Sequence, residues 1–193
     1  MNTSDAHGPK LESERLSIRS LASEDEGLYC SLYTDPEVMR FIAAPLSKER
    51  AIDGFRKTLE LMSQPSFERR VVVLIDRSNQ QPVGISSVRI VDSKIGRAEV
   101  GTLLKPAAHE QGFAWECSTT LITQAFTRPQ INELVAYSAT DNKISERLLI
   151  DLGFTRGDAL AASRGRPERT TWSITRDAWT KRNLGAKSKQ SKD

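Results

Sequence analysis

One segment in the middle of the chain joins a strand end, a glycine-containing loop and the start of a helix. It runs EVGTLLKPAAHEQGFAWE from Glu99 to Glu116, and the helix opens at Gly112-Phe113-Ala114. The first backbone N–H groups of a helix lack partners within it and carry a partial positive charge, so they hold phosphate without a cationic side chain. A glycine there lets the phosphate come close. The alternative is that Gly112 only starts a helix.

Cysteine and histidine are too few and too far apart for several common chemistries. The chain has two of each, Cys30 and Cys117, and His7 and His109. Neither pair has zinc-ligand spacing, and two distant cysteines make no disulfide framework. G-x-S-x-G, G-x-x-x-x-G-K-[ST] and G-x-G-x-x-G are also absent, which disfavours a hydrolase elbow, a P-loop and a Rossmann fingerprint. We therefore expect no metal site.

The elements that must position this segment lie on both sides of it. Period-two alternation and β-branched runs predict strands at 15–19, 70–75, 83–91, 97–104, 134–139, near 154 and at 170–175. Helical spacing and capping signals predict helices that begin near Ser23, Ser47, Ala114 and Asn142. For the first of these, Ser23 and Glu26 have the spacing of a capping box. The resulting order is β, α, α, β-β-β, α, β, α, β-β.

Length and composition favour one globular domain. The chain has 193 residues, a formal net charge of +3, 38% hydrophobic and 27% charged residues. We expect a flexible segment at 1–10, a single domain at 11–183 and a disordered basic tail at 184–193. No apolar run approaches the ~18 residues of a membrane helix, and the polar start lacks a signal peptide. The expected location is the cytoplasm.

Six short motifs together resemble a known family. They are L-x-S-E-R-L-x-I-R (11–19), D-P-E-V-M-R-F (35–41), E-V-G-T-L-L-K-P (99–106), H-E-Q-G-F-A-W-E (109–116), A-T-D-N-K-I-S (139–145) and D-L-G-F (151–154). Their order and spacing resemble the GNAT superfamily of N-acetyltransferases, in particular its RimJ/RimL-type branch. The resemblance implies an α/β (α+β) GNAT fold. Its mixed, mostly antiparallel sheet would have about seven strands, splayed between the fourth and fifth, with about four flanking helices.

The resemblance implies that the loop before the helix wraps the pyrophosphate of acetyl-CoA. The implied contacts come from His109, Gln111, Gly112, Phe113 and Ala114, of which Gly112 and Ala114 match the family pattern. His109 stands where the family has Gln or Arg, and the next residue is a glutamate where this branch usually has glycine.

Further cofactor contacts are implied on the fourth strand and at the start of the helix that follows the fifth strand. Near Leu103 and Leu104, a free backbone N–H of the fourth strand would point at the thioester. Asn142 matches the asparagine that binds the pantetheine, and its structural alternative is a plain helix cap.

Acetyl transfer to an amine needs a base for the ammonium and an acid for the leaving thiolate. Glu99 matches the family's strand carboxylate, which works through a water; alternatively, it faces solvent and pairs with Arg97 or Arg89. Many GNAT enzymes use a tyrosine as the acid, but Leu149 stands at its position here. In the RimJ/RimL-type branch a serine takes this role, and Ser145 matches it, unless it is only an exposed helix serine.

The implied function is transfer of acetyl from acetyl-CoA to a primary amine, by direct attack in a ternary complex. The acceptor is a protein N-terminus or a small-molecule amine; no nucleic-acid or membrane partner is expected, and the protein is a monomer or homodimer. The loop before the last strand contains four arginines, Arg156, Arg164, Arg166 and Arg169. They belong to a solvated hairpin or, alternatively, attract an acidic acceptor or RNA near a ribosomal substrate. The alternative function is a non-catalytic acyl-CoA-binding or partner-binding module of the same fold.

Overall fold

The computed structural model of the chain describes residues 10–64, 69–163 and 165–190. Its strands are β1 (Leu11–Glu12), β2 (Leu16–Ser20), β3 (Arg69–Asp76), β4 (Pro82–Asp92), β5 (Arg97–Leu104), β6 (Glu133–Ala139), β7 (Thr155–Leu160) and β8 (Arg169–Thr175). Its helices are α1 (Glu26–Thr34), α2 (Pro36–Met39), α3 (Lys48–Ser63), α4 (Phe113–Phe126), α5 (Lys143–Leu152) and α6 (Arg176–Gln190), with short 3-10 turns at Ser23–Asp25 and Pro106–Ala108.

The strands of the described residues form one eight-stranded sheet in the order β1-β2-β3-β4-β5-β6-β8-β7. Every neighbouring pair is antiparallel except β5 and β6, which are parallel. The predicted mixed, mostly antiparallel sheet is therefore confirmed. The predicted number of strands is one too small, because the two residues of β1 are too few to establish a period.

The described residues also contain two helices more than the four predicted. One is α2, which starts at the Asp35-Pro36 pair. Asp35 is its N-cap and accepts hydrogen bonds from the backbone N–H groups of Glu37 and Val38, and Pro36 occupies the first helical position. Proline is tolerated there because its missing N–H has no helical partner in any case. The other additional helix is α6 at the end of the chain.

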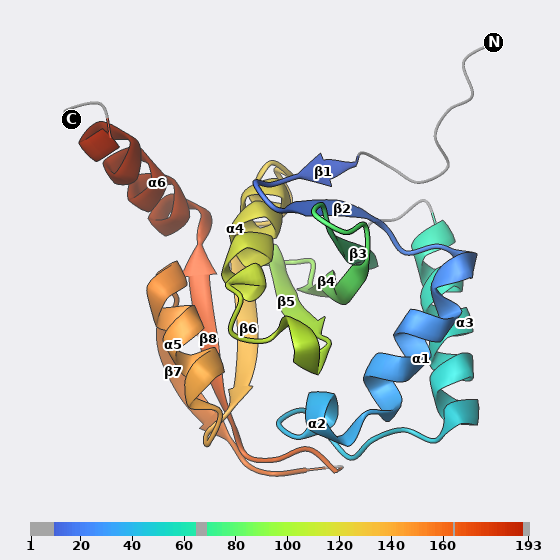
Figure 1. The fold of residues 1–193 in the computed structure, drawn as a ribbon. Coiled ribbons are helices and arrows are strands. Elements are labelled where there is room, and N and C mark those ends of the chain that lie inside the picture. Colours follow the sequence, from blue (N-terminus) through green and yellow to red (C-terminus); the bar gives the residue numbers. More distant parts are fainter. Residues whose placement is uncertain (1–9, 65–68, 164, 191–193) are drawn as a thin grey trace.

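Two helices cover one face of the sheet beside β2 to β5. Val71, Val73 and Ile85 point from β3 and β4 into a cluster with Tyr29 of α1 and Phe55 of α3. The helix predicted to begin near Ser47 therefore packs an apolar face, with Phe55, Leu59 and Met62, against the sheet. Figure 1 shows α1 and α3 side by side at one end of the sheet, away from α5 and α6.

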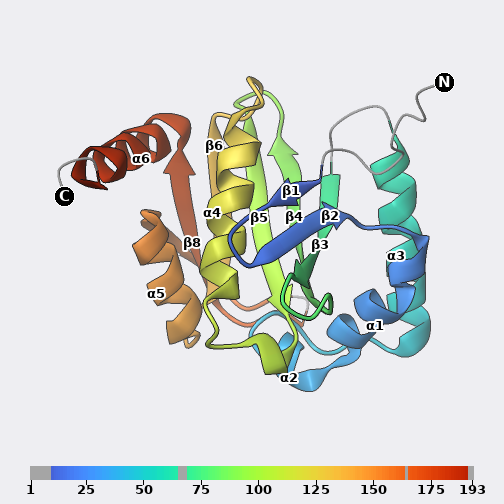
Figure 2. The ribbon, with the colours of Figure 1, turned by 45° about the horizontal axis from the view of Figure 1, so that its top comes forward.

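The opposite face carries α4 and α5. Ala98 of β5 and Leu134 of β6 pack in one cluster with Ile122 of α4 and Leu149 of α5. Further along the same face, Cys117 of α4 packs in a second cluster with residues of β2 to β5. Figure 2 shows α4 lying across the middle of the sheet, over the junction of β5 and β6. This helix therefore joins the two halves of the sheet.

The junction between β5 and β6 is short. Only Arg97, Ala98 and Glu99 of β5 pair with β6, opposite residues 133–135, although β5 runs on to Leu104 and β6 to Ala139. The strands thus separate beyond Glu99 and leave a gap between their C-terminal halves. This is the predicted splay between the fourth and fifth strands, shifted by one in number because β1 precedes them.

The structure differs from the predicted tail. Helix α6 continues to Gln190, across residues 184–190 where the composition predicted disorder, and residues 191–193 lie outside the described part. Lysine, glutamine and alanine are good helix formers, so a tail rich in them prolongs a helix that has already started. The predicted N-terminal segment at 1–10 lies outside the described residues except for Lys10. None of the described helices is long and apolar enough to cross a bilayer.

The cap of the first helical segment is also shifted from its predicted place. The predicted pair was Ser23 and Glu26, but the carboxylate of Asp25 accepts from the N–H of Ala22 over 2.8 Å. Asp25 also receives two bonds from the guanidinium of Arg19. The buried Asp25 is the better placed carboxylate because it serves the cap and the ion pair together.

Candidate active site between the splayed strands

The gap between β5 and β6 exposes one edge of the β5 backbone. Antiparallel strands alternate between residue pairs that exchange backbone hydrogen bonds and pairs that do not. The N–H of Lys105 donates to the oxygen of Val83 over 2.8 Å. Along the β4–β5 register this alternation bonds Leu103 to β4 and turns the N–H groups of Leu104 and Thr102 toward β6. Of the two predicted leucines, the register thus favours Leu104 as the donor that faces the gap.

The loop between β5 and α4 is held by its own side chains. The ring Nε2 of His109 lies 3.3 Å from the backbone oxygen of Leu104. The side-chain amide of Gln111 donates to the oxygen of Ala107 over 2.6 Å. Glu110 is exposed and has a φ of 59°, in the left-handed region that glycine adopts most readily. The backbone here therefore suits the glycine of the family pattern, although the chain places a glutamate there.

Gly112 forms the N-cap of α4 with a φ of 78°. It has no side chain that could bond to the N–H groups of the first turn, so the positive end of α4 stays open. The next residue, Phe113, is 4% exposed and anchors the helix start in the core, while Ala114 packs partly against the same cluster. An open helix N-terminus with a small residue at its entry fits the pyrophosphate of acetyl-CoA.

A polar network ties the chain before β2 to the start of α4. The buried carboxylate of Glu116 accepts from the backbone N–H of Arg15 over 2.6 Å, from the hydroxyl of Ser13 over 2.7 Å, and from Nε of Arg15 over 2.8 Å. Burial raises the pKa of Glu116, but these hydrogen bonds and the charge of Arg15 outweigh it, so its pKa lies below the ordinary value. Glu116 is therefore held as a carboxylate.

The same arginine reaches the loop itself. Nη1 of Arg15 donates to the backbone oxygen of Gln111 over 2.8 Å, and its guanidinium lies 4.9 Å from the centre of the Phe113 ring. A Cβ on Gly112 would come within 3.1 Å of Nη2. Neither Arg15 nor Glu116 was among the predicted site residues. The available signal was that both belong to the quoted motifs.

Asn142 and Ser145 meet at the start of α5. Asn142 is the N-cap, and its Oδ1 accepts from the backbone N–H of Ser145 over 3.0 Å. The cap that the sequence offered as an alternative for Asn142 is therefore present. Both side chains are half-buried. The capping bond uses only the amide oxygen, so the Nδ2 donors of Asn142 stay available to a ligand.

Glu99 lies at the last β5–β6 pair, where the gap begins. Its carboxylate forms an ion pair with Arg89 of β4, the residue directly opposite it, so the predicted alternative pairing with Arg89 is present. Arg97 instead pairs with Glu133. The side chain of Glu99 remains 31% exposed, so water can reach it.

The predicted residues fall into two groups around the gap. Because β5 and β6 run parallel, the loop at 109–114 and the start of α5 follow the same edge of the sheet. Glu99 shares its face with Val71 of the α1–α3 cluster, since side chains of one parity share a face. Ser145 belongs to α5, on the opposite face. The predicted base and acid thus approach the gap from opposite sides.

The arginines near the last two strands are not gathered in one cluster. Arg156 lies 3.6 Å from Glu146 and over the ring of Trp172. Arg169 lies over the ring of Tyr137, and Arg166 is exposed in a small bridge with Ser163. Arg164 lies outside the described residues.

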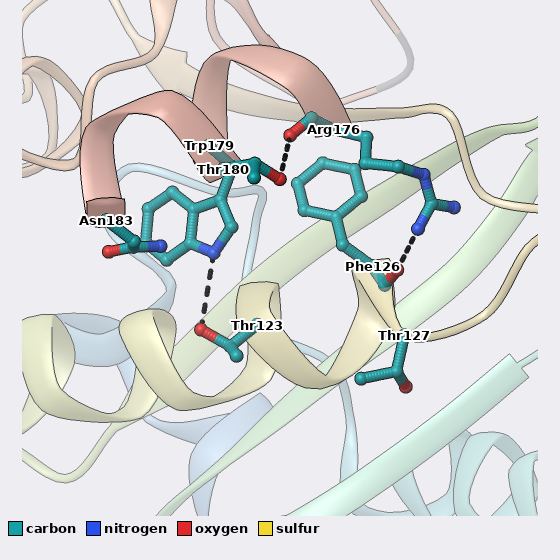
Figure 3. A pocket seen from close by; sticks show the side chains of 7 residues that line it. All are labelled: Thr123, Phe126, Thr127, Arg176, Trp179, Thr180 and Asn183. Carbon is teal, nitrogen blue, oxygen red and sulfur yellow. Dashed lines mark hydrogen bonds between the residues drawn. The ribbon is translucent and has the colours of Figure 1, made fainter. Parts of the chain in front are cut away.

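A hollow of about 280 Å³ between α4 and α6 lies away from this site. It is lined by Thr123, Phe126, Thr127, Arg176, Trp179, Thr180 and Asn183. Figure 3 shows Trp179 and Arg176 of α6 bonded to Thr123 and Phe126 near the C-terminal end of α4. This end is about 20 Å from Gly112, at 1.5 Å per helical residue. This hollow is therefore not part of the candidate site.

Two relatives of the chain are similar to it in sequence over most of its length. An uncharacterized N-acetyltransferase p20 of Bacillus licheniformis is 27% identical over 148 residues, covering 76% of this chain and 82% of the relative. An uncharacterized N-acetyltransferase YoaA of Bacillus subtilis (strain 168) is 25% identical over 154 residues, covering 79% and 86%.

Solved structures share the fold. A spermidine N-acetyltransferase from Vibrio cholerae, in complex with CoA and spermine, has a TM-score of 0.75 at 17% identity and covers 87% of this chain and 99% of its own. RimL, a ribosomal L7/L12 alpha-N-protein acetyltransferase in complex with coenzyme A, has a TM-score of 0.74 at 15% identity and covers 89% and 99%.

The model of the acetyltransferase (GNAT) domain matches residues 15–155 of this chain. That span runs from Arg15 of the network, through the gap and the open helix, to the end of α5. The chain therefore belongs to the GNAT family, and it is an N-acetyltransferase that acts on amino groups.

Proposed function

We propose that this enzyme transfers acetyl from acetyl-CoA to a primary amine by direct attack within a ternary complex, as in the RimJ/RimL-type branch. The observation that carries the proposal is the end of β5–β6 pairing beyond Glu99, together with the uncapped start of α4 that follows β5 in the chain. An amine can approach from the face of Glu99, and the acyl donor from the edge where α4 and α5 begin.

The cofactor half of the site consists of backbone donors and small residues. The N–H groups after Gly112 bind the pyrophosphate, with Arg15 and Glu116 holding the loop in place. The N–H of Leu104 stabilises negative charge on the reacting carbonyl oxygen, and Asn142 bonds to the pantetheine. When bound, acetyl-CoA supplies the activated acyl group.

The proton transfers fall to one residue on each side of the gap. Glu99 accepts a proton from the acceptor ammonium through water, which its partial exposure admits. Ser145 donates a proton to the leaving thiolate from the first turn of α5. Two residues suit these roles, because the amine nitrogen and the thiolate sulfur are separate substituents of the tetrahedral carbon.

The acceptor is an amine on a protein N-terminus or a small molecule. The two CoA-bound neighbours act on spermidine and on the N-terminus of L7/L12, so the fold accommodates both kinds. The alternative, a non-catalytic acyl-CoA-binding module, draws on Glu110 in the loop and on the ion pair that occupies Glu99.

The test is thiol release from acetyl-CoA with purified protein and a panel of primary amines, with the acetylated product identified by mass. We expect turnover with at least one amine, and a loss of about 100-fold or more in kcat for Glu99→Gln and for Ser145→Ala, with smaller changes in KM. An exposed serine of α1, Ser31→Ala, is the matched control. Tight CoA binding without turnover of any amine would support the module instead.

A further inference from the structure

Three charged residues lie in one row across the sheet beside the gap. Arg69 of β3 is paired in register with Arg89 of β4, and Arg89 with Glu99 of β5. Residues directly opposite each other in antiparallel strands point to the same face, with Cβ atoms about 5 Å apart. The row therefore brings two cations and one carboxylate together on the face of Glu99. Like charges directly opposite each other destabilise a sheet, so the two arginines need a compensating reason.

The carboxylate of the row balances only one of the two cations. Glu99 forms its ion pair with Arg89. The Nε of Arg69 is buried and has no hydrogen-bond partner among the described residues. A buried donor without a partner keeps the cost of its lost hydration, and that cost is larger when the donor is charged. The charge of Arg69 is therefore not balanced by an ion pair within the described part of the chain.

The second buried guanidinium nitrogen without a bond partner behaves differently. It belongs to Arg169, whose guanidinium lies 5.2 Å from the centre of the Tyr137 ring. A ring face attracts a cation, so Arg169 has a compensating contact within the protein. Of the two, Arg69 has no such ring contact among the described residues.

Arg69 and Glu99 act on the same small region. Burial raises the pKa of the Tyr33 hydroxyl; the charge of Arg69 opposes the shift and that of Glu99 adds to it. Two residues beyond Glu99 on the same face, Gly101 is exposed, and a Cβ built there would meet no atom within 4 Å. Open space therefore adjoins the row where the gap begins.

We propose that the acceptor carries a carboxylate close to its amine, and that Arg69 binds this carboxylate while the amine lies at Glu99. The inference rests on the proposed function and names its substrate class. Arg69 and Glu99 are two strand spacings apart, about 10 Å between Cα atoms. The amine and a neighbouring side-chain carboxylate of a peptide N-terminus are separated by about two Cα spacings, or 7–8 Å, which suits side chains that lean toward each other. A polycation such as spermidine meets two arginines here and is disfavoured.

The experiment compares two amidated peptides, Ser-Glu-Ala-Ala and Ser-Gln-Ala-Ala, which differ only in the carboxylate. We expect kcat/KM for the glutamate peptide to be at least tenfold higher, mainly through KM, and the preference to shrink as salt is added. The single-residue pair, glutamic acid α-amide and glutamine α-amide, tells whether a free amino acid derivative or a peptide is the source. Spermidine should be a poorer acceptor than the glutamate peptide.

The variants assign the preference to Arg69. Arg69→Gln should reduce the ratio between the two peptides to within about twofold, Arg69→Lys should retain part of it, and the exposed Arg56→Gln of α3 should retain all of it. Equal kcat/KM for the two peptides in the wild-type enzyme, or a full preference in Arg69→Gln, would overturn the inference and leave the proposed function intact. Absence of turnover with every amine would overturn both. If Arg69→Gln does not fold, Arg69→Lys still assigns the preference, and equal kcat/KM for the two peptides in the wild-type enzyme would still overturn the inference.

Discussion

Helices α4 and α5 begin at the same edge of the sheet, but only one of them has a side-chain N-cap. Asn142 caps α5 with its own side chain, which bonds to the N–H of Ser145. Gly112 starts α4 in a left-handed conformation and offers no cap. A side-chain cap satisfies the donors that an anion would otherwise bind. The difference indicates that one helix start is built to receive a phosphate group and the other to hold two side chains in place.

The largest effect on acetyl-CoA affinity is expected for Gly112→Asp, which tests the role of the open start of α4. The change adds a Cβ at a positive φ, close to Arg15, and a negative charge where the pyrophosphate must lie. Two like charges about 4 Å apart repel by about 4 kcal/mol at an effective dielectric of 20, so we expect acetyl-CoA affinity to fall about 1,000-fold. Calorimetry measures it, and Gly165→Asp is the matched control, because it adds the same charge at another glycine of positive φ, where an added Cβ would meet no atom within 4 Å. Unchanged affinity in folded Gly112→Asp would place the cofactor elsewhere.

The second change removes the ion pair between Arg15 and Glu116 at the start of α4. Arg15→Gln deprives the buried carboxylate of Glu116 of its charged partner, and hydrogen bonds to charged groups contribute about 1.5–3 kcal/mol. We expect the free energy of unfolding in urea to fall by about 2 kcal/mol. Glu116→Gln in the Arg15→Gln background should cost little more, since the two residues act as a pair. Additive losses would show that they do not.

Because the pKa of Glu116 is lowered, the contribution of the Arg15–Glu116 ion pair to stability depends on pH. A carboxyl group whose pKa is lower in the folded state stabilises the fold above its unfolded pKa, about 4.5 for a glutamate, and loses that contribution as pH falls through the folded pKa. Wild-type stability should therefore fall with acid below about pH 4.5. Glu116→Gln should flatten that fall, and an unchanged acid profile would contradict the assignment.

At the other helix start, Asn142→Ala removes a cap and no charge. Loss of such a cap costs about 1 kcal/mol of stability. Because the same side chain is proposed to bond to the pantetheine, we expect acetyl-CoA affinity to fall by about tenfold. Asn142→Ser separates the two roles: serine restores the cap but lacks the amide donors. A stable Asn142→Ser variant with full affinity would leave Asn142 a cap alone.

The smallest effect is expected for Glu110→Gly. Glu110 is exposed, and we expect its carboxylate to point to water rather than across the open helix start. Its φ of 59° suits glycine, which offsets part of the entropy that glycine adds to the unfolded chain. We expect acetyl-CoA affinity to rise by less than tenfold, or less than ~1.4 kcal/mol. A much larger gain that salt abolishes would mean that Glu110 faces the phosphates.

The order of elements and the start of α4 could be predicted from the sequence because their signals are local. Alternation along β3 to β5, the Ser47 cap of α3 and the glycine at 112 are each read within a few residues. For residues 184–190 the composition predicts a disordered tail, whereas α6 continues to Gln190, because the growth of a helix depends on the residues that precede a segment.

The contacts that hold the site together could not be predicted from local patterns. Arg15 and Glu116 are 101 residues apart, and no local sequence pattern around either residue predicts their contact. The pairing of Arg69 with Arg89 depends on the register of β3 and β4, which a turn of several residues leaves open. The left-handed backbone of Glu110 gives no local signal, because the side chain is not one that favours it.

The early end of β5–β6 pairing has a consequence for the exchange of backbone amides with solvent. Within β5, the N–H of Leu103 is bonded to β4, while those of Thr102 and Leu104 face the gap. In deuterated water the amides of Thr102 and Leu104 should therefore exchange quickly and that of Leu103 slowly, an alternation inside a single strand. Bound acetyl-CoA would slow Leu104 selectively, so one amide signal reports the filling of the gap without any chemical turnover.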